Sequence, residues 1–157
     1  MLDADHLRLM ESGALIVGVT TDDGTPYATR AWGLRVVDAG DDDRLALVHV
    51  LMPADDPIGL AGFEPDRAVA ITAADVMTLQ SAQFKGRSLG VEPATEDDLE
   101  LSARYFEGFS AAVERSDGQP RGLLERLVPF ELVRCIVQVH EAYDQTPGPG
   151  AGQELGR

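Results

Sequence analysis

Cysteine and lysine are almost absent from this sequence of 157 residues, which contains one of each, Cys135 and Lys85. A single cysteine excludes a disulfide within the chain. No run of about 18 apolar residues occurs, so the sequence predicts no membrane-spanning helix. The first residues also lack the basic start and apolar core of a signal peptide. We therefore expect a cytoplasmic protein.

Positive charge and metal-ligating side chains are scarce as well. Lys+Arg number 13 against 27 Asp+Glu, and the resulting net charge of -14 opposes binding to nucleic acid or to an anionic membrane. The three histidines, His6, His49 and His140, do not have the short spacing of a zinc site. Residues 41–43 are three aspartates without the spaced ligands of a calcium loop, and they predict a solvated turn. No metal site is expected.

Hydrophobic alternation and turn residues predict about six strands and two or three helices. The Asp-Gly pair at 23–24 predicts a tight hairpin, so the first three strands are expected to form an antiparallel meander. Thr95 and Asp98 predict a capped start for the longest helix. The predicted strands are 14–21, 27–37, 44–51, 67–73, 78–90 with a bulge near Gly86, and 132–143; the predicted helices are 3–11, 95–116 and 121–127, with a short helix or loop in 53–65.

This pattern indicates an α+β fold with a mostly antiparallel sheet. Closing such a sheet into a small barrel removes exposed strand edges, and the glycine-marked bends favour that closure. The length favours a single domain, which we place at residues 1–144. Residues 145–157 are expected to be a Gly/Pro-rich tail, because the prolines and glycines of 147–152 disfavour both a helix and a central strand.

A row of polar side chains follows one predicted strand. Ser81, Gln83, Lys85 and Arg87 alternate with apolar residues and therefore share one face of that strand. Arg30 occupies a similar position on an earlier strand. A guanidinium, an ammonium and nearby hydroxyls are the donors that a phosphate dianion prefers. From the pattern alone, a phosphate site and a solvent-facing polar stripe both remain open.

Several short motifs follow one another in a defined order along the chain. An Asp-Gly-Thr-Pro turn precedes the strand that holds Thr29 and Arg30; a Val-Ala-Ile-Thr strand follows at 69–72, and Gln-Phe-Lys-Gly at 83–86. From about Leu7 to Gly152 the chain resembles the pyridoxamine 5′-phosphate oxidase-like family. The resemblance implies a six-stranded split β-barrel with flanking helices, which forms a homodimer and binds FMN in clefts at the dimer interface.

The resemblance also implies a set of cofactor-binding residues. Arg30 and Lys85 match positions that hold the FMN phosphate, with Thr29 and Ser81 as hydroxyl donors. Gln83 matches a polar position near the edge of the flavin ring. Trp32 either walls the pocket or packs in the core.

The function implied is that of a flavin-dependent oxidoreductase acting on a small organic substrate. The Arg-x-His ending of true pyridoxamine phosphate oxidases is absent, which argues against that particular substrate, and no catalytic residue is assigned. Two alternatives remain open: a non-catalytic flavin- or heme-binding protein of the same fold, and a deazaflavin-dependent reductase.

Overall fold

A computed structural model of the chain describes residues 2–40 and 43–156. Two of the three aspartates predicted to form a solvated turn, Asp41 and Asp42, lie outside the described residues. The elements are α1 (Ala4–Ser12), β1 (Ala14–Thr20), β2 (Pro26–Arg30), β3 (Leu34–Asp38), β4 (Ala46–Pro53), α2 (Pro57–Ala61), β5 (Ala68–Ala74), β6 (Ser81–Pro93), α3 (Glu96–Asp117), α4 (Arg121–Glu125), β7 (Leu132–Asp144) and β8 (Glu154–Gly156).

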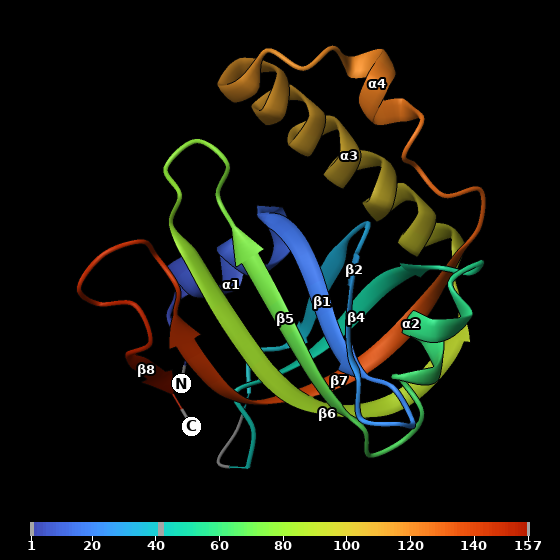
Figure 1. Cartoon of the computed structure of the whole chain (residues 1–157), viewed down its shortest axis with the longest axis vertical. Helices are drawn as coiled ribbons and strands as arrows, with labels where there is room; N and C mark the ends of the chain where they lie inside the picture. The colour runs from blue at the N-terminus through green and yellow to red at the C-terminus, as the bar shows by residue number, and fades with distance from the viewer. Residues whose placement is uncertain (1, 41–42, 157) are drawn as a thin grey trace.

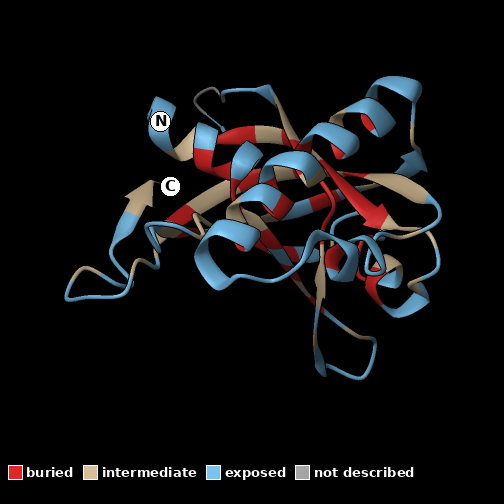
Figure 2. Ribbon diagram, turned by 90° about the horizontal axis from the view of Figure 1, so that it is seen from above, coloured by how far each residue is buried: buried red, intermediate tan, exposed pale blue. Residues whose placement is uncertain are grey.

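The strands form one antiparallel sheet that curls into a barrel (Figure 1). The strand order is β2-β1-β5-β6-β7-β4-β3, with β8 added beside β7. Inward-facing residues such as Leu15, Val17 and Ile71 are fully buried, and the alternation of the strands places them all on the barrel's inner face. In Figure 2 the buried positions follow the strands and the inner sides of the helices, whereas the hairpin loops are exposed. The α+β barrel prediction is confirmed, with eight strands rather than six.

The predicted strand 27–37 is wrong in one respect, because the chain breaks it at Ala31–Gly33. β2 pairs with β1 and β3 pairs with β4, so the three-strand meander does not form. Residues 31–33 cross from β2 to β3 and form hydrogen bonds to β1 and β4. The Ala31 amide donates to the Leu15 carbonyl, and the Trp32 amide donates to the Leu51 carbonyl. Gly33 has a φ of 144°, which disfavours other residues. This crossing joins the two ends of the strand path.

The helices begin where the sequence predicts them. The Asp3 carboxylate caps α1 by accepting from the amides of Asp5 and His6. At α3, the Thr95 hydroxyl accepts from the Asp98 amide while the Asp98 carboxylate accepts from the Thr95 amide, which is a complete capping box. Figure 1 shows α3 and α4 lying across one end of the barrel. No helix of the described part of the chain is long and apolar enough to cross a membrane.

The predicted tail contains one further strand. Residues 145–152 form turns, as their glycines and prolines predict, but Glu154–Gly156 pairs with Ala142 and Tyr143 of β7 as β8. Thr146 also joins the tail to β6, since its hydroxyl accepts from the Ser81 amide at 3.1 Å. The segment after residue 144 is therefore joined to the barrel near its start by Thr146 and at its end by β8, with an exposed loop between them.

Candidate functional site

The outer face of β1, β2, β5 and β6 carries a groove of about 750 Å³. We call it the Lys85 groove. In sheet register, Ala28 lies beside Gly18, Gly18 beside Ala70, Ala70 beside Lys85, and Lys85 beside Glu141. Side chains in such a cross-strand row share one face. The row therefore forms a floor of small residues with charged side chains at one end.

Two cations stand at that end of the groove. Lys85 is exposed on β6, and its Nζ lies 4.6 Å from the centre of the Tyr143 ring. The Tyr143 hydroxyl donates to the Glu141 carboxylate at 2.6 Å. Arg87, two residues along β6, also lines the groove and donates from Nη1 to the Asp66 carbonyl at 3.0 Å. The ammonium and the guanidinium supply donors for an anion at this end.

A bulge between β6 and β7 shapes the wall of the groove. The register shifts between Lys85 and Gly86, so that Gly86 lies opposite Val139 and His140 is passed over. A Cβ on Gly86 would lie 1.8 Å from the Gln138 carbonyl oxygen, so only glycine allows the strands to approach this closely. This confirms the bulge predicted near Gly86 and explains why Lys85 and Arg87 flank a glycine.

The remaining side chains predicted for the site lie in neighbouring rows. Gln83 is aligned with Thr72 and, through β1, with Arg30, one row away from Lys85. Its amide donates to the Thr72 hydroxyl at 3.3 Å. Ser81 lies two residues before Gln83 on the same face of β6. The predicted shared face of Ser81, Gln83 and Lys85 is therefore present.

Arg30 lies on the same outer face but is turned toward α3. Its guanidinium carbon is 4.7 Å from the centre of the Phe109 ring, and its Nη1 is buried with no hydrogen-bond partner among the described residues. β2 and β6 are separated by β1 and β5 rather than adjacent. Three strand spacings and two residue steps put the Arg30 and Lys85 Cα atoms on the order of 16 Å apart along the sheet.

Thr29 and Trp32 are not at the groove. Thr29 is aligned with the fully buried Val17, which places it on the inner face of β2, opposite to Arg30. Trp32 is 4% exposed, and its ring lies 6.4 Å from that of Phe106 on α3. Of the two roles considered for Trp32, the structure shows packing beneath α3.

The small residues of the floor were missed by sequence reasoning. Gly18, Ala28 and Ala70 carry no functional group, and only the register of three strands makes them one surface. Tyr27 was missed too: it lines the groove and donates its hydroxyl proton to Asp56 at 3.0 Å. That hydrogen bond raises the pKa of the Tyr27 phenol above its usual value. Alternation on β2 puts Tyr27 on the inner face with Thr29, so the sequence pattern gave no sign that Tyr27 borders the groove.

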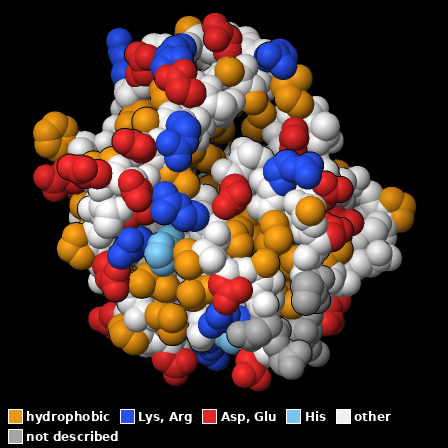
Figure 3. All heavy atoms as spheres, turned by 180° about the vertical axis from the view of Figure 1, so that it is seen from behind, with side chains coloured by type: hydrophobic (Ala, Val, Ile, Leu, Met, Phe, Trp, Pro, Cys, Tyr) orange, Lys and Arg blue, Asp and Glu red, His pale blue; other side chains and the backbone are white. Residues whose placement is uncertain are grey.

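Charged and potentially metal-ligating side chains also occur away from the Lys85 groove. On the face shown in Figure 3, basic side chains are interspersed with acidic and hydrophobic ones and do not form a continuous basic stripe. Within residues 2–40 and 43–156, no three His, Cys, Asp or Glu side chains gather in a metal-ligating group. Cys135 is fully buried, and burial raises the pKa of its thiol to about 12. A buried thiol of this kind is not a nucleophile.

Comparison with known proteins agrees on the fold. No family model and no curated protein matches the chain. Among solved structures, HupZ from Group A Streptococcus is 15% identical with a TM-score of 0.55, over 98% of this chain and 99% of that one. An F420 reductase is 14% identical with a TM-score of 0.55, over 90% and 98%.

A putative pyridoxamine 5′-phosphate oxidase from Lactobacillus delbrueckii is 12% identical with a TM-score of 0.52, over 90% of this chain and 93% of that one. Likenesses at such identities concern the backbone and its topology. The chain has the pyridoxamine 5′-phosphate oxidase-like split-barrel fold.

Proposed function

We propose that the chain binds FMN in the Lys85 groove and is a flavin-dependent oxidoreductase acting on a small organic substrate. The observation that carries this proposal is the floor of Gly18, Ala28 and Ala70 with Lys85 and Arg87 at one end. A floor without bulky side chains suits a flat ring system. The two cations suit the phosphate.

The residues present fit this cofactor in a second way. An added Cβ on Gly18 would meet no atom closer than 3.9 Å, so the floor is open above the strands. Gln83, in the next row, supplies a side-chain amide that can donate to or accept from a ring edge. Arg30 does not line the groove and packs on Phe109 of α3, so it is not assigned to the phosphate.

The chemistry would be divided between cofactor and protein. A bound flavin supplies the hydride-accepting ring, and the protein supplies its binding, orientation and electrostatics. Lys85 and Arg87 would hold the phosphate by charge-assisted hydrogen bonds, and Tyr27 would form part of the side wall. We further propose that a second copy of the chain covers the groove as a homodimer. Ile16, 42% exposed on the same sheet face, would be buried by that contact.

Titration with FMN and riboflavin tests the phosphate assignment. Removing one charged partner of a phosphate costs about 1.5–3 kcal/mol, roughly ten- to a hundredfold in affinity. Lys85→Gln should therefore weaken FMN by that factor and leave riboflavin almost unchanged, as measured by flavin fluorescence. Arg104→Gln, which changes an exposed arginine on α3, is the matched control and should change neither. Equal losses for both ligands would mean that Lys85 does not contact phosphate.

Titrating the same protein with other ligands distinguishes FMN from the alternative cofactors. Because the fold is similar to that of an F420 reductase, a deazaflavin is a specific alternative cofactor. Coenzyme F420 is therefore titrated beside FMN under identical conditions. Tighter binding of F420 would replace FMN as the cofactor. Heme is added as a third ligand. A flavin that binds but is not reduced by NADH or NADPH with transfer to an acceptor would favour the non-catalytic alternative.

A further inference from the structure

A second groove adjoins the first on the other side of Tyr27. Its volume is about 620 Å³, and it lies between α2 and the turn that joins β1 to β2. We call it the α2 groove. It shares Thr20, Pro26 and Tyr27 with the Lys85 groove. Volumes of this size are typical of small-molecule sites.

The walls of the α2 groove are mostly apolar. Ile58, 50% exposed on α2, and the exposed Ala61 form one side, and the Tyr27 ring forms another. α2 packs closely against the barrel. A Cβ added to Gly62, just after the helix, would lie 2.3 Å from the Val19 side chain. Asp56 caps α2 by accepting from the Gly59 amide at 2.9 Å. These contacts make the apolar wall part of the packed structure.

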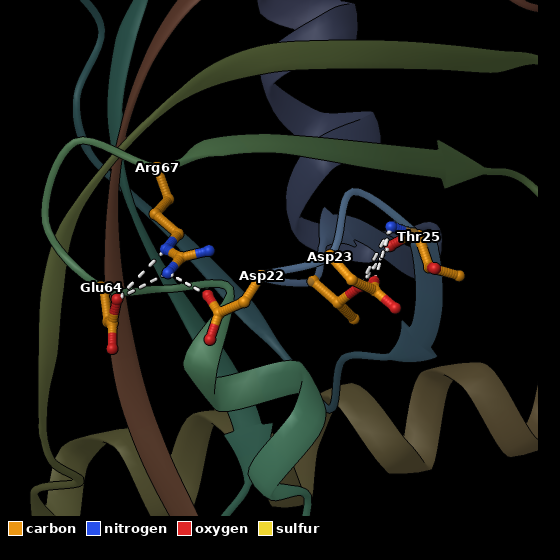
Figure 4. Close-up of polar contacts among 6 residues, drawn as sticks. Asp22, Asp23, Thr25, Glu64 and Arg67 are labelled. Atoms are coloured by element: carbon orange, nitrogen blue, oxygen red, sulfur yellow. Dashed lines mark hydrogen bonds and ion pairs between the residues drawn. The ribbon is translucent and has the colours of Figure 1, made fainter.

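The rim of the α2 groove is acidic. Figure 4 shows the Arg67 guanidinium lying between Glu64 and Asp22, to both of which it is hydrogen-bonded. One guanidinium therefore serves two carboxylates. Asp23, in the same turn as Asp22, has no basic partner among the described residues, and Asp56 adds a further carboxylate behind Tyr27. The negative charges around the groove outnumber its one positive charge.

Asp23 is held in its ionised form. Its Oδ1 accepts from the Thr21 hydroxyl at 2.6 Å and from the Thr25 amide at 3.0 Å. These hydrogen bonds lower the pKa of the Asp23 carboxyl to about 2, the Thr21 hydroxyl having the largest effect. All the hydrogen bonds found for Asp23 go to Oδ1, which leaves Oδ2 to accept from a ligand. A cation that reaches the rim would meet this fixed charge.

We propose that the α2 groove is a binding site for small apolar molecules that carry a protonated amine. The apolar body would lie between the Tyr27 ring and Ile58, and the ammonium would face Asp23. The acidic rim repels an anion, and a neutral molecule would gain only the apolar contacts. The site is distinct from the Lys85 groove, whose end holds Lys85 and Arg87 beside Glu141, and it does not depend on whether FMN binds there.

Three probes with one apolar body test the charge requirement: 2-phenylethylamine, 2-phenylethanol and phenylacetate. Each is titrated into the full chain at pH 7, without FMN, while amide NMR shifts are followed. We expect the amine to bind tightest and to shift the amides of Ile58, Ala61 and Tyr27. Its advantage over the alcohol should shrink as salt is raised. Equal affinities for the three probes, or shifts confined to other parts of the barrel, would overturn the proposal.

Variants separate charge from shape. Asp23→Asn should weaken the amine by up to about fivefold, the upper end for one exposed ion pair, and leave the alcohol unchanged. Because Asp23 stabilises its own turn, Ala61→Phe serves as a second variant: it fills the groove and should abolish binding of both probes. Ala111→Phe, at an exposed alanine of α3, is the control for a bulky residue on a helix surface. Retained binding in Ala61→Phe would place the ligand elsewhere.

The proposed FMN site and the proposed amine site can each be refuted without refuting the other. An amine that binds at α2 in a chain that takes up no flavin leaves this inference standing. Flavin binding with no preference for the amine overturns this inference alone. The FMN titration and the amine titration are therefore read independently.

Discussion

Replacing Asp98 by alanine should remove a larger part of the stability than any other single carboxylate on α3. Asp98 is 1% exposed, and its Oδ2 accepts from both the amide and the hydroxyl of Thr95 at 2.9 Å. The same oxygen lies 3.4 Å from Nη1 of Arg134. The substitution therefore removes the carboxylate half of the capping box and one of the two ion-pair partners of Arg134.

The expected loss can be worked out from these contacts. Loss of the carboxylate that accepts from the Thr95 amide and hydroxyl costs about 1 kcal/mol. Arg134 keeps its ion pair with Glu92 and is 20% exposed, so the loss of its second partner adds about 1 kcal/mol rather than the full cost of a stranded buried charge. A total of about 2 kcal/mol should lower the melting temperature of a chain this size by about 4–8 °C.

Urea and thermal unfolding followed by circular dichroism measure this loss. Asp97→Ala is the matched control, because Asp97 is an exposed acid in the same helical turn, and it should cost less than about 0.5 kcal/mol. A double-mutant cycle with Thr95→Ala should show that the two changes are not additive. An Asp98→Ala protein as stable as the parent, or a control that loses as much, would refute the reasoning.

The pH dependence gives the same prediction an independent check. Burial raises the pKa of the Asp98 carboxyl, but hydrogen bonds from Thr95 and the charge of Arg134 outweigh burial and hold the pKa below its usual value. The resulting stability is present above the unfolded pKa of about 3.9 and is lost as the pH falls through the lower folded pKa. The Asp98→Ala protein should lack this part of the acid-induced loss.

Three further predictions concern other parts of the barrel. Gly86→Ala forces a Cβ against the Gln138 carbonyl and should cost about 3 kcal/mol or more in urea unfolding; an unchanged midpoint would contradict the tight bulge. Cys135, fully buried with a thiol pKa of about 12, should resist iodoacetamide in the native protein and react once urea unfolds it, as mass spectrometry would show. Tyr27→Phe removes the hydrogen bond to Asp56 and should cost about 1 kcal/mol, measured by thermal unfolding.

Local signals predicted the elements whose structure is decided locally. The alternation of β7 and the Thr95–Asp98 box were both confirmed, because burial on one face and helix capping involve neighbouring residues. The strand break at Ala31–Gly33 was not predicted. Residues on both sides favour extended structure, and the break depends on hydrogen bonds to Leu15 and Leu51, which are distant in sequence. The same holds for β8, which pairs with the part of β7 that extends beyond β4.

The candidate site was predictable along a strand but not across strands. Alternation placed Ser81, Gln83 and Lys85 on one face, and the structure agrees. The floor beside Lys85 depends on the register of β1, β2 and β5, which a single sequence does not reveal. Arg30 is turned away from Lys85 by a contact with Phe109, a residue on a helix nearly eighty positions later.

The crossing at Ala31–Gly33 has a consequence for how the barrel moves. A closed ladder opens only by losing many bonds together, whereas here β2 and β3 meet through three residues and a few amide contacts. Transient opening of the sheet should therefore occur first between β2 and β3. The Trp32 and Leu51 amides there would exchange with deuterium sooner than those of central β6. We expect the barrel to open along this line while the strands on either side of it stay paired.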